Sequence, residues 1–274
     1  MSVFTIDPER CDSCRMCAVE CPAAIIEIAK PKALPTLADG GEERCIVCGH
    51  CVAVCPKAAI ALDKMRPEQC APLRRELLPS AEQVEHLLKS RRSIRAYKKD
   101  KVPHETLARL IDITRYAPSG HNSQEVQWLV VEDPGETRQL AGLVVDWMRA
   151  EFEKSPRLGR LLHFDTIVAG WDKGRDPVLR GAPHVIVAHA SKAALLAQVN
   201  CTIALTYLEL AACSMGLGTC WAGWLHAAAA SGQTVKAALR LPEGNEFFGA
   251  MMVGYPRHRF SRIPLRNEPV VIWR

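Results

Sequence analysis

The stretch CDSCRMCAVECP at residues 11–22 returns, with the same spacing of cysteines and proline, as CIVCGHCVAVCP at residues 45–56. A shift of 34 residues superposes the two runs and also aligns Ala24 with Ala58 and Ile26 with Ile60. Such self-similarity is typical of a duplicated structural unit. We therefore predict a small domain at residues 1–63 that contains two copies, each a ligand loop followed by a short helix and a strand.

The spacing within each run indicates the ligand chemistry. A 4Fe-4S cube needs four thiolates; a Cys-x2-Cys-x2-Cys loop supplies three, and the cysteine before the proline of the other run supplies the fourth. We assign one cluster to Cys11, Cys14, Cys17 and Cys55, and the other to Cys45, Cys48, Cys51 and Cys21. Zinc sites share the Cys-x2-Cys element, but two complete runs argue against zinc. Residues 1–63 strongly resemble bacterial two-cluster ferredoxins.

The cysteine content also bears on the compartment. The chain has 12 cysteines, and its first residues lack the basic and apolar regions of a secretory signal. We therefore expect a cytoplasmic protein whose thiols bind metal and do not form disulfides. The remaining cysteines have no ligand spacing and are expected to be small buried residues: Cys70, Cys201, Cys213 and Cys220.

Composition and charge exclude several classes of partner. The net charge of +5 is spread along 274 residues, so we predict no nucleic-acid partner. Residues 193–215 are mostly apolar but include Asn200 and Glu209, which favours a buried helix over a membrane span. Residues 1–63 contain six Lys and Arg against nine Asp and Glu, a net charge of −3, which leaves +8 for residues 64–274. The two parts of the chain therefore differ in electrostatic character.

A connector and a second domain follow the cysteine runs. Residues 64–79 contain three prolines and are predicted to be an extended linker. Ser80 and Gln83 match a capping box that starts a helix and the domain at residues 80–274. We predict further helices at 104–116, 136–154, 193–215 and 233–241, and strands at 127–131, 185–189 and 247–253. This alternation indicates an α+β domain with a central mixed sheet flanked by helices.

One segment of this domain gives no clear periodicity. Residues 155–183 are predicted to be a long irregular stretch, of the kind that forms a mobile lid. Three residues in it, His163, Phe164 and Trp171, are candidates to line a substrate entrance. Glu209 and Asn200 are expected to make structural polar contacts. His121, His184, His189 and His226 show no paired spacing, so none is assigned as a ligand or base.

The sequence RRSIR at residues 91–95 follows the first helix of the second domain. The three guanidinium groups and the hydroxyl can form forked hydrogen bonds to a phosphate, although a solvated basic turn explains this motif equally well. Four further motifs follow in order: APSGHNSQ at 117–124, GLGTCW at 216–221, GYP at 254–256 and RIPLR at 262–266. Together they resemble the FMN-dependent nitroreductase family over residues 84–274.

That resemblance implies an α+β homodimer with FMN at the subunit interface. It assigns the phosphate and ribityl chain to Arg91, Arg92, Ser93 and Arg95, joined by Arg262 and Arg266. It has Pro118, Ser119, Gly120 and Asn122 reach the flavin from the partner subunit. It places Trp221, Ala222 and Gly223 beside the isoalloxazine edge, with backbone N–H groups near N5. Many family members carry a carboxylate there; its absence here leaves the local tuning open. A separate Rossmann site for NAD is not indicated, because Gly216-Leu217-Gly218 follows a helix and lacks the later glycine.

The combination of cofactors suggests the function. A flavin exchanges electrons singly or in pairs, whereas each cluster passes one at a time, and no side chain is needed as a covalent nucleophile. We expect a flavoenzyme whose clusters receive electrons from a redox partner such as ferredoxin or NAD(P)H and whose FMN reduces a small molecule. The resemblance implies nitroaromatics and quinones as substrates. The alternative is an electron carrier that exchanges electrons with a redox protein instead of a small molecule. The acidic balance of residues 1–63 suits docking with a basic redox partner. Reversed electron flow is a variant of the first hypothesis.

Overall fold

The computed structural model describes residues 3–274 and divides into two compact units. One unit extends to Leu78 and includes His121–Ser123; the other contains Pro79–Gly120 and Gln124–Arg274. The first unit has one hydrophobic core and the second has two. The two are described separately below.

The first unit contains short elements around the cysteine runs. Its strands are β1 (Phe4–Ile6), β2 (Ile26–Glu27), β3 (Thr36–Leu37) and β4 (Ile60–Leu62), and its helices are α1 (Met16–Val19), α2 (Gly41–Arg44) and α3 (His50–Val54). β1 pairs antiparallel with β4, and β2 with β3. Each copy of the repeat is therefore a loop, a short helix and a strand, which confirms that prediction. Ile25, Val52 and Ile60 are buried at the centre of the unit.

The segment that follows β4 is irregular apart from two single turns of 3-10 helix, η1 (Pro67–Gln69) and η2 (Arg75–Leu77). α4 (Ala81–Ser90) then begins with the predicted capping box: the Ser80 hydroxyl accepts a hydrogen bond from the Gln83 backbone N–H at 3.2 Å. In return, the Ser80 backbone N–H donates to the Gln83 side chain at 2.8 Å. These two bonds satisfy N–H groups that the first helical turn leaves free.

The second unit is larger and contains one four-stranded sheet. Its strands are β5 (Gln127–Val131), β6 (His184–Ser191), β7 (Gly218–Trp221) and β8 (Asn245–Gly254). Besides α4, it contains α5 (His104–Thr114), α6 (Pro134–Lys154), α7 (Pro156–Leu161), α8 (Phe164–Asp172), α9 (Ala197–Ser214), α10 (Gly223–Ser231) and α11 (Gln233–Ala238). A 3-10 turn, η3, spans Gly120–Asn122. No helix among residues 3–274 is long and apolar enough to cross a membrane.

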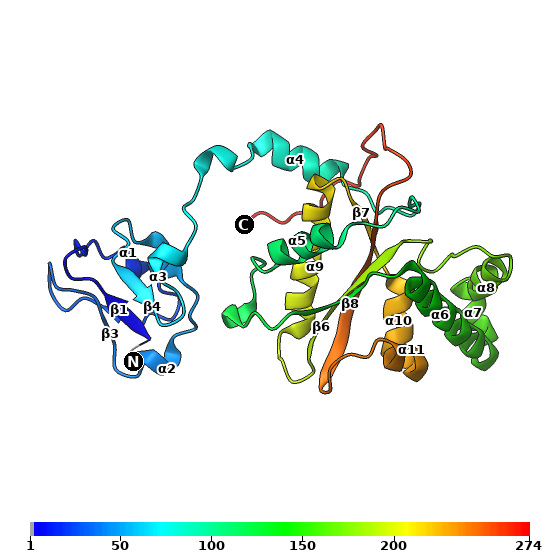
Figure 1. Cartoon of the computed structure of the whole chain (residues 1–274), viewed down its shortest axis with the longest axis horizontal. Helices are drawn as coiled ribbons and strands as arrows, with labels where there is room; N and C mark the ends of the chain where they lie inside the picture. Colours follow the sequence, from blue (N-terminus) through cyan, green and yellow to red (C-terminus); the bar gives the residue numbers. More distant parts are fainter. Residues whose placement is uncertain (1–2) are drawn as a thin grey trace. The chain divides into compact units, whose positions relative to one another are not determined.

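The sheet separates two cores. Its strand order is β5-β6-β8-β7. Ile186 and Met251 pack with α5 and α9, whereas Val187 and Met252 pack with α6 and α10. Figure 1 shows α5 and α9 on one side of the sheet and α6, α10 and α11 on the other. Because successive residues of a strand point to opposite faces, the almost continuous apolar sequence of β6 fills both cores.

The α+β class and the predicted strands agree with this architecture, but the strand directions differ from the expected mixed sheet. Every neighbouring pair of the four strands is antiparallel. Val131 at the end of β5 lies opposite Val185 at the start of β6. The helices α6 to α8 therefore leave and re-enter the sheet at the same end, which makes β5 and β6 antiparallel.

The segment 155–183 is not the irregular stretch that the sequence suggested, because it contains α7 and α8. Pro156 at the first position of α7 and glycines at 159 and 170 interrupt the pattern without preventing helix. Phe164 is 2% exposed and makes edge contacts with Trp147 and Trp224, with ring centroids 5.6 Å apart in both pairs. Trp171 packs against the core beneath Arg138. Phe164 and Trp171 are thus packing residues, and of the three candidates for a substrate entrance only His163 is exposed.

Candidate functional site

The two cysteine loops have matching backbone conformations. Three pairs of residues 34 positions apart share a positive φ: Ser13 and Val47, Arg15 and Gly49, and Ala24 and Ala58. The left-handed region is costly for most side chains, and most of all for a β-branched residue such as Val47, whose φ is 48°. Each loop therefore has a tightly curled path that turns its thiols toward one centre.

The structure brings the cysteines together in two crossed sets. One cavity is lined by Cys21, Cys45, Cys48 and Cys51. A second is lined by Cys11, Cys14, Cys17 and Cys55. Each set takes three thiols from one run and the fourth from the other; the assignment of these thiols as cluster ligands stays a prediction. Among residues 3–274, no three His, Cys, Asp or Glu side chains form a group that could hold a metal ion, so the thiols do not meet around one point as a tetrahedral zinc ion requires. They surround cavities instead, which fits a cube of iron and sulfur better.

Electrostatics also link the thiols of each set. Burial is the main cause that raises the pKa of Cys51 to about 11, and negative charge on Cys48, Cys45 and Cys21 contributes to the rise. Burial likewise raises the pKa of Cys17, with smaller contributions from Cys14 and Cys11. In addition, the Ala59 backbone N–H donates a hydrogen bond to the Cys55 sulfur at 3.3 Å. Hydrogen bonds to ligand sulfurs are one of the ways in which proteins adjust cluster potentials.

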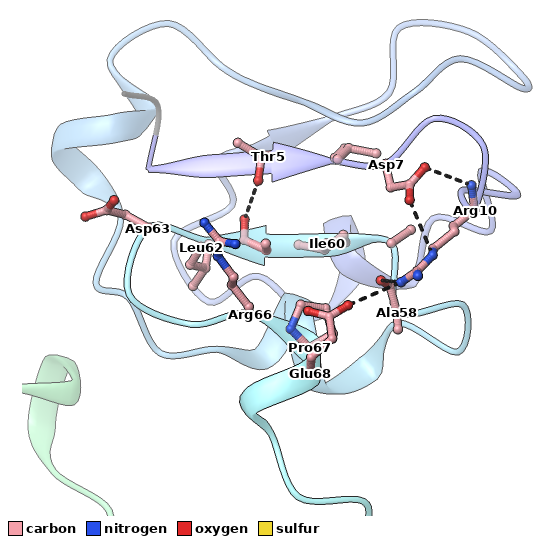
Figure 2. A pocket seen from close by; sticks show the side chains of 13 residues that line it. Thr5, Asp7, Arg10, Ala58, Ile60, Leu62, Asp63, Arg66, Pro67 and Glu68 are labelled. Atoms are coloured by element: carbon pink, nitrogen blue, oxygen red, sulfur yellow. Dashed lines mark hydrogen bonds and ion pairs between the residues drawn. The ribbon is translucent and has the colours of Figure 1, made fainter.

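A wide groove on the first unit lies beside these sets. Its volume is about 640 Å³. Figure 2 shows the side chains that line it, among them residues of β4 and of the turn at Arg66–Glu68. Arg10 crosses one end and is bonded to the Glu68 carboxylate and the Ala58 carbonyl, at 3.4 and 3.3 Å. Its Nε also lies 3.3 Å from Asp7. No cysteine ligand candidate lines this groove, and three of its charged side chains, Asp7, Arg10 and Glu68, pair with one another, so we do not assign it a cofactor.

The RRSIR motif lies beside β7 in the second unit. The Ile94 backbone N–H donates to the Thr219 carbonyl at 2.8 Å. A Cβ on Gly218 would lie 2.5 Å from Ile94 and 2.9 Å from Pro256, so only glycine allows this approach. Burial raises the pKa of the Cys220 thiol, and the charge of Arg95 and a hydrogen bond with the Ser93 side chain partly offset this rise. The exposed Arg95 donates a hydrogen bond to the Ser93 carbonyl at 3.5 Å.

Arg91 and Arg92 line a pocket of about 620 Å³ whose charged residues are all basic or histidine. Four further basic or histidine residues join them there: His86, Lys98, His258 and Arg259. Sequence reasoning missed Lys98, His258 and Arg259, because these three come together only through pairing of distant segments. Lys98 N–H donates to the Tyr255 carbonyl at 2.9 Å, and Arg257 N–H donates to the Ala96 carbonyl at 2.9 Å. Two sequence motifs lie close to them: RRSIR, and GYP, whose Tyr255 and Pro256 line the pocket.

Arg262 and Arg266, which the resemblance adds to the phosphate site, are exposed in the segment after β8. Neither residue lines the basic pocket. Their role remains a prediction.

The predicted flavin loop divides between the two units. Pro118 is exposed, and the Ser119 hydroxyl accepts a hydrogen bond from Gln124 N–H at 3.1 Å. Gly120 N–H donates to the Asn200 side chain at 3.1 Å. His121–Ser123 groups with the first unit, where the Asn122 amide donates to the carbonyls of Ile46 and Val47, both at 3.1 Å. In this conformation Asn122 thus holds the loop between Cys45 and Cys48.

The segment expected beside the isoalloxazine begins α10. Trp221 is partly exposed, whereas Ala222 is buried and donates its N–H to the Ala250 carbonyl at 2.9 Å. Gly223 is the first residue of α10, and a Cβ built on it meets nothing within 4 Å. The first helical turn has N–H groups without partners inside the helix. The open space at Gly223 therefore fits an acceptor atom of a planar ligand such as a flavin.

Comparisons with known proteins identify both parts of the chain. A model of the nitroreductase family matches residues 88–255, and a model of the 4Fe-4S dicluster domain matches residues 10–60. The iodotyrosine deiodinase of Thermotoga neapolitana is 30% identical over 186 residues, which are 68% of this chain and 94% of that protein.

Solved structures give the same picture of the fold. A nitroreductase with bound FMN from Bacteroides fragilis aligns with a TM-score of 0.57 at 20% identity, over 70% of this chain and 99% of its own. An oxidised iodotyrosine deiodinase bound to FMN and 3-iodo-L-tyrosine aligns with a TM-score of 0.54 at 26% identity. That alignment covers 70% of this chain and 98% of the deiodinase.

Proposed function

Because this chain belongs to the nitroreductase family and carries an N-terminal 4Fe-4S dicluster domain, we propose that it is an iron–sulfur flavoenzyme with two 4Fe-4S clusters and FMN. In this proposal it passes electrons between the clusters and FMN and reduces a small oxidant, such as a nitroaromatic or a quinone. Membership of the family makes it an FMN-dependent oxidoreductase. The number of clusters, the substrate class and the direction of electron flow are the proposed parts.

The observation that carries the proposal is the crossed convergence of the eight cysteines. Two cavities, each with three thiols of one run and one of the other, match the donor set of a two-cluster domain. A chain that carries two one-electron centres and also has the fold of a flavin-binding family can convert single electrons into pairs. Thiolate ligands also need a reducing compartment, which supports a cytoplasmic location.

The basic pocket at Arg91 and Arg92 is the proposed phosphate site. Planar guanidinium groups bind phosphate through paired hydrogen bonds, and Lys98 and Arg259 add positive charge. When bound, FMN would supply hydride and single-electron chemistry at its ring. The protein's own part is to hold the phosphate at this pocket, to orient the ring beside Gly223 and to donate backbone N–H groups from the first turn of α10.

We further propose a homodimer in which the loop at Pro118–Gly120 of one subunit completes the flavin site of the other. Support comes from apolar side chains left in solvent by a single chain. In the segment after β8, Leu265, Val270 and Trp273 are 96%, 99% and 88% exposed. Exposed apolar residues clustered in this way are typical of surfaces that another chain covers.

Anaerobic reduction of the purified full-length protein tests the function. NADH, NADPH and reduced ferredoxin are compared as donors, and the absorbance of flavin and clusters is followed separately. The expected result is that ferredoxin bleaches the clusters before the flavin. If NADH bleaches the flavin before the clusters, the proposed direction of electron entry is wrong. If the isolated protein contains no flavin, the whole proposal fails.

Reoxidation of the reduced protein then identifies the acceptor. A panel of a nitroaromatic, a quinone and 3-iodo-L-tyrosine is suitable, the last because related proteins are named as deiodinases. Rapid reoxidation by one of these supports an enzyme that reduces small molecules. Reoxidation by a redox protein and by none of the small molecules would instead support an electron carrier, for which the net charge of −3 in residues 1–63 is suited.

A further inference from the structure

Glu209 is a buried carboxylate in a helix whose other buried residues are almost all apolar. It lies on α9 and is 8% exposed. Moving an ionised carboxylate out of water is costly unless the charge is paired and hydrogen-bonded. Leucine or methionine would fill the same position without that cost. The presence of a charge here therefore calls for an explanation beyond packing.

The partner of Glu209 is Arg91 of the RRSIR motif. Arg91 Nη1 donates to Glu209 Oε1 at 2.6 Å, and the two side chains are 25% and 10% exposed. A charge-assisted bond of this length is strong and directional. The residues lie 118 positions apart in the chain, so the pair joins the end of α4 to the middle of α9.

The pair uses only part of the hydrogen-bonding capacity of Arg91. A guanidinium group has five N–H donors in a rigid plane, and one of them is bonded to Glu209. Arg91 also lines the basic pocket, together with Arg92, Lys98 and Arg259. No carboxylate lines that pocket. Without Glu209, repulsion from these cations would favour rotamers that turn Arg91 toward solvent.

We infer that Glu209 is a positioning residue that orients the Arg91 guanidinium toward the phosphate of the flavin. The inference rests on the proposed function, because it assumes that the basic pocket receives the FMN phosphate. Holding a long side chain in its binding rotamer before the ligand arrives lowers the entropy lost on binding. A purely structural ion pair would leave the selection of phosphate unchanged.

The test compares two flavins that differ only in the phosphate. The full-length protein, freed of bound flavin, is titrated anaerobically with FMN and with riboflavin, and binding is followed by quenching of flavin fluorescence. Glu209→Ala is expected to weaken FMN binding by about tenfold, a loss within the range of coupling between residues in contact, and to change riboflavin binding by less than about twofold. Glu209→Gln keeps a hydrogen-bond acceptor and should recover part of the loss. Glu85→Gln, which breaks an exposed ion pair with Lys89 on α4, is the matched control.

A double variant shows whether Glu209 acts through Arg91. Arg91→Ala should weaken FMN binding, and adding Glu209→Ala should cause no further loss if the two residues act as a unit. Equal weakening of FMN and riboflavin in Glu209→Ala, or additive losses in the double variant, would overturn the inference. If Glu209→Ala does not fold, the ratio of the FMN and riboflavin dissociation constants of Glu209→Gln is compared with that of the wild type instead. An unchanged ratio would overturn the inference. If the wild-type protein binds FMN no more tightly than riboflavin, the proposed phosphate site is wrong, and this inference is wrong with it.

Discussion

The side-chain oxygen of Asn200 accepts a hydrogen bond from the backbone N–H of Gly120 at 3.1 Å. The amide nitrogen of the same residue donates to the Glu125 carboxylate at 2.6 Å. Asn200 is 2% exposed and lies on α9. One buried carboxamide therefore ties the loop that carries Pro118 and Ser119 to the helix beneath it.

Replacing Asn200 with Leu should destabilise the second unit, because the N–H of Gly120 and the carboxylate of Glu125 lose the partner that Asn200 provides. Removing one partner of a buried polar pair costs about 1–3 kcal/mol, and more when a charge is involved. We expect a loss of about 3 kcal/mol in thermal or denaturant unfolding. Thr206→Ala, at an exposed position of the same helix, should change stability by less than about 0.5 kcal/mol. Equal stabilities for the two variants would show that the Asn200 contacts contribute little.

His184 provides a prediction on pH. Its Nε2 accepts a hydrogen bond from the Val102 backbone N–H at 2.8 Å, and the residue is 1% exposed. Burial lowers the pKa of His184 from its ordinary value of about 6.5, so the unfolded chain binds a proton that the folded protein does not. The contribution of His184 to the free energy of unfolding is therefore fully present above about pH 6.5. It is lost as the pH drops toward the lower pKa of the folded state.

The measurement is urea unfolding at several values between pH 5 and 8. His184→Gln can still accept from Val102 and should lose part of the decline below pH 6.5. Burial also lowers the pKa of His189, so a residual slope is expected. His163→Asn changes an exposed histidine and should leave the slope as in the wild type. A slope in His184→Gln as steep as in the wild type would rule out this residue as the source.

The crossed assignment of cysteines predicts different outcomes for two double variants. Cys21 and Cys48 line one cavity, so Cys21→Ser with Cys48→Ser should damage one cluster and leave about half of the iron. Cys14 lines the other cavity, so Cys21→Ser with Cys14→Ser should damage both clusters. Iron analysis and electron paramagnetic resonance of the reduced proteins give the readout. The opposite order of iron contents would mean that each run ligates its own cluster. Cys70→Ser, at an exposed cysteine outside both cavities, is the control.

Much of this arrangement could be predicted from the sequence, and the exceptions have physical causes. The cysteine sets and β5 follow from local spacing and periodicity, which survive folding unchanged. β7 is only four residues long and was recognised as a motif instead of a strand, and the alanine-rich α10 gave no amphipathic pattern. The charged residues of the basic pocket were missed in part because Lys98 and Arg259 meet through the pairing of Tyr97 with Pro256. The Arg91 contact with Glu209 depends in the same way on tertiary packing that no local pattern encodes.

The exposed apolar side chains in the segment after β8 allow a test of the proposed homodimer. Ile272 and Trp273 are 82% and 88% exposed in the single chain, and apolar anchors of this size supply much of the affinity at protein interfaces. If the chain forms the proposed homodimer through this segment, the paired change Ile272→Ser and Trp273→Ser should raise the dissociation constant of that dimer by about 10- to 100-fold. Because neither side chain is packed in a core, unfolding of the separated subunit should change little. Light scattering after size exclusion, over a range of protein concentrations, measures the effect. Leu161→Ser, an equally exposed apolar position on α7, serves as the control; loss of the dimer in that variant but not in the tail variant would place the interface elsewhere.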